Sequence, residues 1–408
     1  MIINKAFENK KLKNNILALG AEASNAKKKN PQVINATSGM FKGEDGSLYE
    51  FISVKNAIDS LNASQKFSYA NTTGSTNFKR AIFKSIFGKY QDEVSKNNFY
   101  DVIPTPGGTG ALNVSFFNYA EKGDVVLLPN YMWENYMNLC EDMSVNYDTY
   151  RLFDDCDLFD IKDLNNKVSI LSTKQKRIMM LINDPCQNPT GFCMKDEDYD
   201  ALLRIAYDYP NNDFVYVIDI AYFDFYSADL DIIRNRFAKF KDVPNNALAL
   251  FTYSGSKSFG LYGLRIGALL ALSKSEKEIE CFHNASAFAS RTKWSNATHL
   301  GMNIIEALIL NEQFHEQYLS EIKEVCSLLE KRGQTFINSA KEVGLKILPY
   351  QRGFFASIPC ANSEKVMLDL QKDGVYLIPM KDGLRIALSS VNLEEAKRLP
   401  IIIKKHLG

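Results

Sequence analysis

One lysine of the chain stands among residues that suit covalent chemistry. Lys257 follows an apolar run that is typical of a buried strand, and Ser254, Ser256 and Arg265 lie close to it in the sequence. A lysine amine attacks an aldehyde when burial or nearby cations lower its pKa, and a strand end that opens into a cleft meets this requirement. The two hydroxyls and the guanidinium could hold a phosphate nearby. The alternative is a loop lysine with serines beside it by chance.

A carboxylate ends a second apolar run. Asp219 is the last residue of Phe-Val-Tyr-Val-Ile-Asp, and Tyr222 follows three residues later. In a ligand crevice such a carboxylate could hold the protonated ring nitrogen of a cofactor. Taken alone, an aspartate at a strand end is more often a helix N-cap or a turn residue.

Two turns also follow predicted strands. The segment 183–191 holds two prolines and a glycine, so it forms a rigid turn that could present the Asn188 amide, with the Tyr222 hydroxyl, to a phenolic oxygen. A plain Asn-Pro turn explains the same residues equally well. Gly108 and Thr109 lie in a glycine cluster that opens a helical pattern, where backbone N–H groups bind phosphate. The cluster lacks the G-x-G-x-x-G spacing, which argues against a nicotinamide-dependent dehydrogenase.

The elements that position these residues are short apolar runs separated by helical patterns. This alternation predicts an α/β domain with a mostly parallel sheet, helices on both of its faces, and ligands at the carboxyl ends of the strands. The predicted strands are Asp124–Leu128, Ile178–Ile182, Phe214–Ile218, Ala247–Thr252 and Ile266–Leu272.

A second, smaller α+β domain is predicted after the sheet. A charged amphipathic stretch runs from about Leu300 to Leu329, and four short strand-like runs follow it. We expect a large domain at 45–312 and a small domain formed by 1–44 and 313–408. The strand-like runs are Lys346–Leu348, Phe354–Ile358, Val375–Ile378 and Leu384–Leu388.

Composition excludes several classes of protein. The 48 basic residues balance 48 acidic ones, so no long-range field favours nucleic acid. The seven cysteines include no C-x-x-C pair, which argues against a disulfide framework and against a structural zinc site, and we expect no metal. The segment Met1–Leu12 has no apolar core of a signal peptide, and no stretch is long enough to span a membrane. We expect a cytoplasmic protein.

Taken together and in this order, these segments resemble the fold-type I enzymes that use pyridoxal 5'-phosphate (PLP). Within them the chain is similar to the aspartate and aromatic amino acid aminotransferases of class I, across nearly its whole length. The resemblance rests on the Ser-x-Ser-Lys segment with Arg265, on Asn188-Pro-Thr-Gly191, and on Asp219 with Tyr222. It implies a PLP Schiff base on Lys257, with Asp219 at the pyridine nitrogen.

The resemblance also assigns roles to residues outside these motifs. It implies that Trp133 stacks on the cofactor ring and that Tyr69 reaches the cofactor phosphate of a neighbouring subunit, which requires a homodimer. Arg385 would bind the substrate α-carboxylate, Arg291 a side-chain carboxylate in the partner's site, and Gly39 would close over the substrate.

The chain departs from this pattern at three positions. Tyr136 and Gln187 stand where the aspartate subgroup usually carries histidine, and Gly107 stands where the subgroup often has a serine facing the phosphate. The mechanism implied by the resemblance is unaffected, because Lys257 and Asp219 are present.

The activity implied is transamination between an L-amino acid, aspartate or aromatic, and a 2-oxo acid. Lys257 would carry the α-proton, and the kinetics would be ping-pong. A PLP-dependent β-decarboxylase or C–S lyase would use the same lysine and aspartate, and a non-catalytic PLP-binding regulator would keep the fold.

Overall fold

A computed structural model describes residues 2–3, 5, 8, 10 and 16–407 of the chain. Much of the segment 1–12, on which the prediction about a signal peptide depends, lies outside these residues. Within the described residues, no helix combines the length and apolar character that crossing a membrane requires. The same residues contain no group of three or more His, Cys, Asp or Glu side chains that could hold a metal ion.

The chain forms two compact units. The larger unit contains 48–331 and 349–355, and the smaller contains 1–47, 332–348 and 356–408. The helix α14 (Glu312–Glu342) contributes residues to both units. The domain limits expected from the sequence, at 44/45 and 312/313, stay a proposal.

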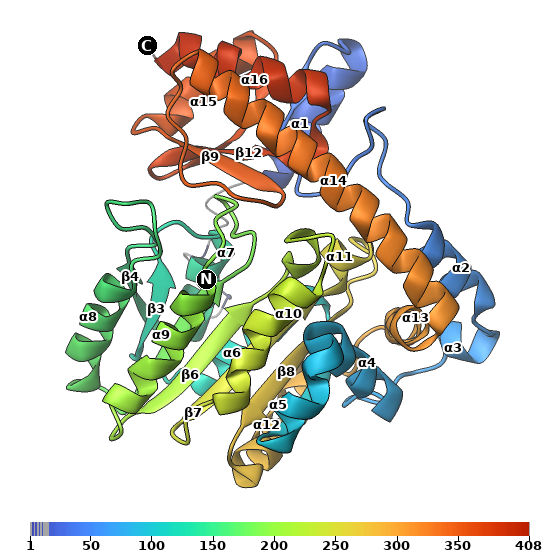
Figure 1. The fold of residues 1–408 in the computed structure, drawn as a ribbon, viewed down its shortest axis with the longest axis vertical. Helices are drawn as coiled ribbons and strands as arrows, with labels where there is room; N and C mark the ends of the chain where they lie inside the picture. Colours follow the sequence, from blue (N-terminus) through green and yellow to red (C-terminus); the bar gives the residue numbers. More distant parts are fainter. Residues whose placement is uncertain (1, 4, 6–7, 9, 11–15, 408) are drawn as a thin grey trace. The chain divides into compact units, whose positions relative to one another are not determined.

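The larger unit is built on a seven-stranded sheet in the order β2-β8-β7-β6-β5-β3-β4. β8 runs antiparallel to both of its neighbours, and the other pairs are parallel. The predicted mixed α/β fold with a mostly parallel sheet is therefore confirmed (Figure 1). The strands are β2 (Phe99–Thr105), β3 (Val125–Pro129), β4 (Asn146–Tyr150), β5 (Arg177–Asn183), β6 (Asp213–Asp219), β7 (Ala247–Ser254) and β8 (Gly267–Ser273).

Helices cover both faces of this sheet, as Figure 1 shows. One face is aliphatic: alternate strand residues such as Val215, Val217 and Leu250 pack against α6, α7 and α12. The other face is aromatic, where Phe251 packs edge-on against Phe237 and Phe240. The helices of this unit are α2 (Ile52–Ser60), α3 (Ala63–Phe67), α4 (Thr76–Phe87), α5 (Gln91–Lys96), α6 (Gly107–Tyr119), α7 (Asn135–Met143), α8 (Ile161–Ser172), α9 (Asp196–Asp208), α10 (Asp231–Phe237), α11 (Gly255–Ser258), α12 (Glu276–Lys293) and α13 (His299–Leu310).

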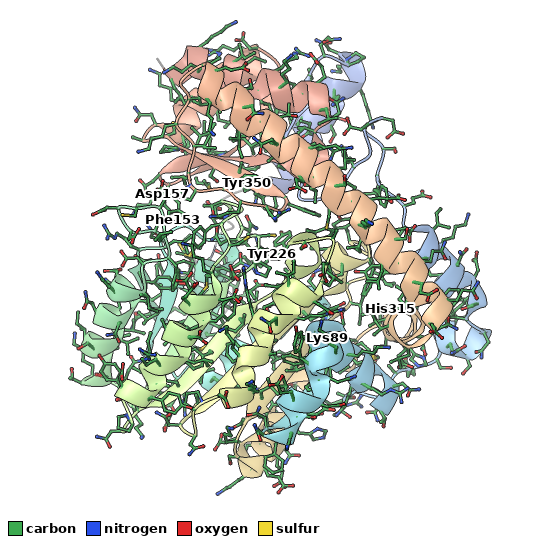
Figure 2. The ribbon with its side chains drawn as sticks, in the orientation of Figure 1. Lys89, Phe153, Asp157, Tyr226, His315 and Tyr350 are labelled. Carbon is green, nitrogen blue, oxygen red and sulfur yellow. The ribbon has the colours of Figure 1, made fainter. Side chains whose placement is uncertain are left out.

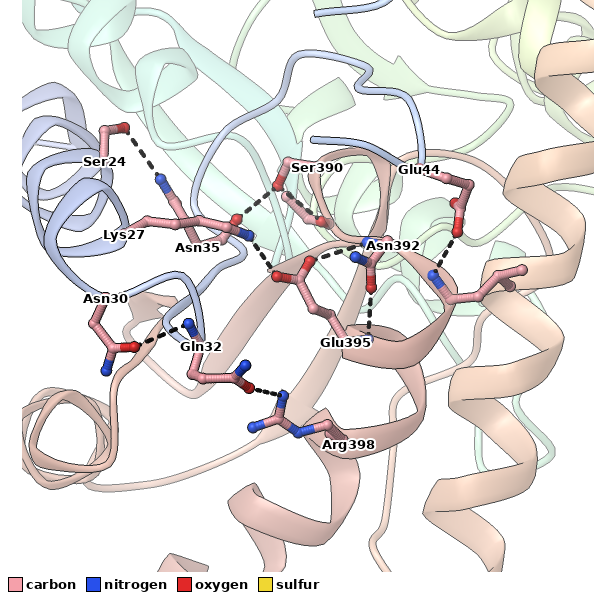
Figure 3. A network of polar contacts seen from close by, with 12 residues as sticks. Ser24, Lys27, Asn30, Gln32, Asn35, Glu44, Ser390, Asn392, Glu395 and Arg398 are labelled. Carbon is pink, nitrogen blue, oxygen red and sulfur yellow. Dashed lines mark hydrogen bonds and ion pairs between the residues drawn. The ribbon is translucent and has the colours of Figure 1, made fainter. Parts of the chain in front are cut away.

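The smaller unit combines helices with two small sheets, as predicted for an α+β domain. β1 pairs with β10 in parallel, and a three-stranded sheet has the order β11-β12-β9. Figure 3 shows polar contacts between its N-terminal and C-terminal segments, among them the ion pair of Lys27 with Glu395 and the hydrogen bond from Ser390 to the carbonyl of Asn35. Its elements are α1 (Ile16–Lys29), β1 (Ile34–Asn35), β9 (Phe355–Pro359), α15 (Ser363–Lys372), β10 (Val375–Tyr376), β11 (Ile378–Met380), β12 (Gly383–Ala387) and α16 (Leu393–Leu407).

Two local predictions for the second half of the chain are wrong. Lys346–Leu348 is not a strand: Leu348 donates one backbone hydrogen bond to Ser357, and Pro349, which has no N–H, follows directly. The predicted run Val375–Ile378 is two strands, because β10 pairs with β1 whereas β11 pairs with β12.

Candidate active site

Three neighbouring strands of the large unit end at one edge of the sheet with polar residues. Asn183 ends β5, Asp219 ends β6 and Ser254 ends β7, and the register aligns Asn183 with Asp219 and Asp219 with Thr252. Because side chains alternate along a strand, Asn183 and Asp219 point to the same face as Val217, the aliphatic face covered by α6 and α7. The carboxyl ends of parallel strands thus gather these groups in one place, as expected for a ligand site.

Asp219 is a buried carboxylate with two donors. Its side chain is 5% exposed, Oδ1 accepts a hydrogen bond from the backbone N–H of Ala221 at 3.1 Å, and Oδ2 accepts one from the Tyr136 hydroxyl at 2.6 Å. Burial raises the pKa of the Asp219 carboxyl above its ordinary value, and the hydrogen bonds from Tyr136 and Ala221 oppose this rise. The site therefore stabilises a negative charge in a dry environment.

Lys257 lies on the short helix α11, which begins directly after β7. Its Nζ is 5.7 Å from the centroid of the Tyr222 ring and 4.9 Å from that of the Tyr262 ring. Tyr222 is itself held by the rings of Phe354 and Phe355, at centroid distances of 5.3 and 5.6 Å. Two aromatic faces thus hold the amine next to the strand ends. Tyr262 was not among the residues predicted from the sequence.

The turn that carries Asn188 is anchored by its neighbours. Asn188 is 6% exposed, and its backbone N–H donates to Asn183 Oδ1 at 2.8 Å. Gln187 accepts from the N–H and hydroxyl of Thr190, and its amide donates to the carbonyl of Tyr131 at 2.7 Å. The hydrogen bonds of Gln187 thus order the turn, while Tyr136 is the departure from the family pattern that contacts Asp219 directly.

Gly191 closes this turn against Tyr350, which is labelled in Figure 2. A Cβ at residue 191 would lie 2.3 Å from Tyr350 Cδ2 and 2.5 Å from the carbonyl oxygen of Phe355, so only glycine fits there.

Polar groups that suit an anion lie at the start of α6. Ser254 and Ser256 are buried, and the Ser256 hydroxyl accepts a hydrogen bond from Arg265 Nη1 at 2.9 Å. Gly107 has a φ of +70°, and a Cβ there would lie 2.7 Å from Arg265 Nη2. The guanidinium therefore occupies the space that a side chain at residue 107 would need. Gly108 and Thr109 form the first turn of α6, whose backbone N–H groups have no partner within the helix.

A pocket of about 450 Å³ opens beside these groups at the start of α6. Its walls include the side chains of Thr109, Arg265 and Lys293, so they are basic and hydrogen-bonding. Asn113 Oδ1 and Trp294 Nε1, also in its walls, are buried with no hydrogen-bond partner among the described residues. Hydrogen-bond donors, a guanidinium and a helix N-terminus suit a phosphate. The buried carboxylate of Asp219 suits a ring nitrogen, and the Lys257 amine suits an aldehyde. This donor set fits PLP.

Three further predicted residues also lie in the large unit. Trp133 is half-buried and stands edge-on to Tyr136, with ring centroids 5.7 Å apart. Tyr69, between α3 and α4, is 93% exposed. Arg291, near the end of α12, is exposed and donates to Ser295 Oγ at 2.7 Å.

The two other predicted substrate residues belong to the smaller unit. Arg385 lies on β12, is 7% exposed, and donates from Nη2 to the carbonyl of Thr37 at 3.2 Å. Gly39 follows Thr37 by two residues and is half-buried. The structure therefore brings the segment of Gly39 close to Arg385.

Comparisons with known proteins show the family of this chain. Residues 31–400 match the family described as aminotransferase class I and II. The chain is 25% identical to the aromatic-amino-acid aminotransferase of Escherichia coli over 376 residues, covering 90% of this chain and 91% of that one. It is 24% identical to the aspartate aminotransferase of the same organism over 359 residues, covering 85% and 87%. A crystal structure of an aminotransferase from Anaerococcus prevotii shares 30% identity and a TM-score of 0.95, with 100% of both chains covered.

A dry carboxylate, an amine and polar groups that suit an anion at one sheet edge define the class of enzymes that use PLP. The chain belongs to the class I and II aminotransferase family, and its activity is PLP-dependent transamination.

Proposed function

We propose that this aminotransferase moves an amino group from aspartate or an aromatic L-amino acid to a 2-oxo acid by a ping-pong mechanism. The similarity to both an aspartate and an aromatic-amino-acid aminotransferase supports these donors. The observation that carries the proposal is the placement of Asp219 at the end of β6, on the strand next to β7, which leads directly to Lys257.

The large unit supplies the groups that hold the cofactor in this proposal. Asp219 would face the ring nitrogen, Asn188 and Tyr222 would face the phenolic oxygen, and Trp133 would stack on the ring. The phosphate would be held by Gly108, Thr109, Ser254, Ser256 and Arg265. The basic pocket at the start of α6 and the hydrogen bond between Arg265 and Ser256 support this assignment. When bound, PLP supplies a conjugated ring that accepts the electron pair left behind when the substrate loses its α-proton.

Lys257 and Asp219 share the proton chemistry. With PLP bound, Lys257 Nζ would be the base that accepts the α-proton of the substrate. Asp219, whose carboxylate accepts hydrogen bonds from Tyr136 and Ala221, would hold a proton on the ring nitrogen of the cofactor. The rings of Tyr222 and Tyr262 limit where the amine can move.

Two arginines would select the substrate. The planar guanidinium of Arg385 would bind the α-carboxylate, with Gly39 closing over the substrate, and the low exposure of Arg385 favours a strong charge-assisted pair. Arg291 and Tyr69, both exposed, would enter the site of a second copy in a homodimer. We further propose a cytoplasmic location, which the seven free cysteines support.

The substrate proposal is tested by replacing Arg291. Initial rates are measured with aspartate and with phenylalanine as donors and 2-oxoglutarate as acceptor, for the wild type, Arg291→Ala and Lys277→Ala. Lys277 lies at the opposite end of the same helix and serves as the control. We expect kcat/KM for aspartate to fall about 100-fold in Arg291→Ala only, because the side-chain carboxylate of aspartate would lose its charged partner, while phenylalanine is little affected. Unchanged aspartate turnover would refute a role of Arg291 in binding a dicarboxylate.

A further inference from the structure

Tyr136 is a buried phenol that contacts the carboxylate at the centre of the site. Its hydroxyl donates to Asp219 Oδ2 at 2.6 Å, and the ring is 1% exposed. It comes from the first turn of α7, the helix that follows β3 and packs on the aliphatic face of the sheet. A second donor to Asp219, the N–H of Ala221, belongs to the chain directly after β6, and the Thr252 hydroxyl on β7 also lowers the pKa of the carboxyl.

The position of this phenol is fixed by its surroundings. The Trp133 ring stands at 85° to the Tyr136 ring, and the backbone N–H of Tyr136 donates to the carbonyl of Trp133 at 3.0 Å. The phenol is therefore built into the wall of the site, held by the residue that is proposed to stack on the cofactor.

We propose that Tyr136 is a positioning residue that keeps Asp219 ionised and directed at the ring nitrogen of the cofactor. It does so by donating a hydrogen bond to Asp219 Oδ2, which the carboxylate needs because burial has removed it from water. This inference rests on the proposed role of Asp219.

The physical argument is a balance between burial and donors. A buried carboxyl favours its neutral form, which could not hold a proton on a ring nitrogen, and each donor to the carboxylate shifts the balance back. Ala221 serves one oxygen and Tyr136 the other, so loss of the phenol leaves one oxygen of the ion without this donor. Hydrogen bonds to ions contribute roughly 1.5–3 kcal/mol, which corresponds to about 1–2 pKa units.

A phenol also brings no charge of its own into the site. Burial and the neighbouring Asp219 raise the pKa of Tyr136 well above its ordinary value, so it remains a neutral donor. The other titratable groups that act on Tyr136 are the phenols of Tyr150 on β4 and Tyr222 after β6.

The test compares Tyr136→Phe with Tyr150→Phe. Tyr150 is an equally buried phenol of the same region, but its hydroxyl donates to the carbonyl of Leu181 at 3.0 Å. The full chain is labelled with carboxyl-¹³C aspartate, the Asp219 resonance is assigned with Asp219→Asn, and its titration is followed without cofactor. Dissociation constants for PLP are measured by equilibrium dialysis at pH 7.5.

Tyr136→Phe should raise the titration midpoint of Asp219 by about 1 unit or more and weaken PLP binding about 10-fold or more. Tyr150→Phe should change neither. A wild-type midpoint in Tyr136→Phe would overturn the inference, whereas a wild-type chain that binds no PLP would instead contradict the proposed function.

A second variant keeps the test decisive if Tyr136→Phe does not fold. Tyr136→His retains a donor, so PLP affinity should stay within a few-fold of the wild type. Because an imidazole titrates between pH 5 and 8, the Asp219 resonance should then follow the protonation of the new histidine. An Asp219 resonance that ignores this protonation would show that residue 136 does not act on the carboxylate.

Discussion

The side-chain amide of Asn183 joins the end of β6 to the turn that carries Asn188. Its Nδ2 donates to the backbone carbonyl of Asp219 at 2.9 Å, while its Oδ1 accepts from the backbone N–H of Asn188 at 2.8 Å. One amide therefore fixes the main chain at two residues that are proposed to contact the cofactor on different sides.

Replacing this amide should loosen both residues together. In Asn183→Ala the buried N–H of Asn188 loses its partner, while the carbonyl of Asp219 keeps only the hydrogen bond from the N–H of Asp184. We expect a loss of about 1–3 kcal/mol in the free energy of unfolding and PLP binding about 10-fold weaker. Urea unfolding and equilibrium dialysis measure the two effects.

Asn212 offers a control for simple destabilisation. Its amide donates to the carbonyls of Ser172 and Gln175, next to the first residue of β6 and at the opposite end of that strand from Asp219. Asn212→Ala should lower stability and leave PLP affinity unchanged. If Asn212→Ala weakens PLP binding as much as Asn183→Ala does, the link to the site is not specific.

Gly107 should be required for phosphate binding. In Gly107→Ala the new Cβ would lie 2.7 Å from Arg265 Nη2, so the guanidinium must leave its place beside Ser256. We expect PLP affinity to fall about 10-fold, while affinity for pyridoxal, which has no phosphate, stays the same.

The matched variant is Gly123→Ala. Gly123 also has a positive φ, of +96°, but a Cβ there meets nothing within 4 Å. Both variants should lose about 1 kcal/mol of stability from backbone strain, but only Gly107→Ala should lose PLP affinity. Equal PLP affinity in the two variants would contradict the assigned place of the phosphate.

Asp184 should make the stability of the fold depend on pH. Burial raises the pKa of its carboxyl to about 7, although Tyr199 and the N–H of Met194 donate to it. Between about pH 4 and pH 7 the folded state therefore keeps a proton on Asp184 that the unfolded state has lost. Asp184 thus makes the free energy of unfolding fall as the pH rises through that range. Above about pH 7 it no longer changes the free energy of unfolding with pH.

Asp184→Asn should remove this contribution, because an amide does not titrate and can still accept from Met194 and pair with Tyr199. The slope of the unfolding free energy between pH 4 and 7 should become less negative by up to about 1.4 kcal/mol per pH unit, the value for one proton. Asp224, whose pKa burial raises to about 6, adds a slope of the same sign that should persist in the variant. Identical slopes for wild type and variant would show that Asp184 is ionised in the folded protein.

Two inactive variants should restore each other if the sites are shared between subunits. Lys257→Ala lacks the amine, and Arg291→Ala lacks the arginine proposed to reach across to the partner. A mixed dimer has one site with both residues, so random exchange should return up to about a quarter of the wild-type aspartate activity. No recovery, with exchange verified by differently tagged subunits, would argue that Arg291 serves its own subunit.

The central strands of the sheet were predictable from the sequence, whereas its two edge strands were not. β3, β5, β6, β7 and β8 are apolar runs because both of their faces are covered, and the predictions match them to within two residues at each end. β4 has the sequence Asn-Tyr-Asp-Thr-Tyr and β2 contains Pro104, because an edge strand tolerates polar residues and a missing N–H.

Some site residues could be predicted from the sequence, and others could not. Asp219 and Lys257 stand at the ends of apolar runs, so their place at the sheet edge follows from local pattern alone. The bridging role of Asn183 depends on β5 lying beside β6, and the contact of Tyr136 depends on how α7 packs across the sheet. Strand order and helix packing come from long-range contacts, which spacing along the chain does not encode. An asparagine that directly follows a predicted strand was the available signal for Asn183.

The identity of the lysine that binds the cofactor is the most direct test of this account. The protein loaded with PLP is reduced with borohydride, digested, and the modified peptide sequenced by mass spectrometry. The cofactor should be fixed to the peptide that contains Lys257, and Lys257→Ala should yield no labelled peptide. A label on any other lysine of the wild type would contradict the placement of the active site at the ends of β6 and β7.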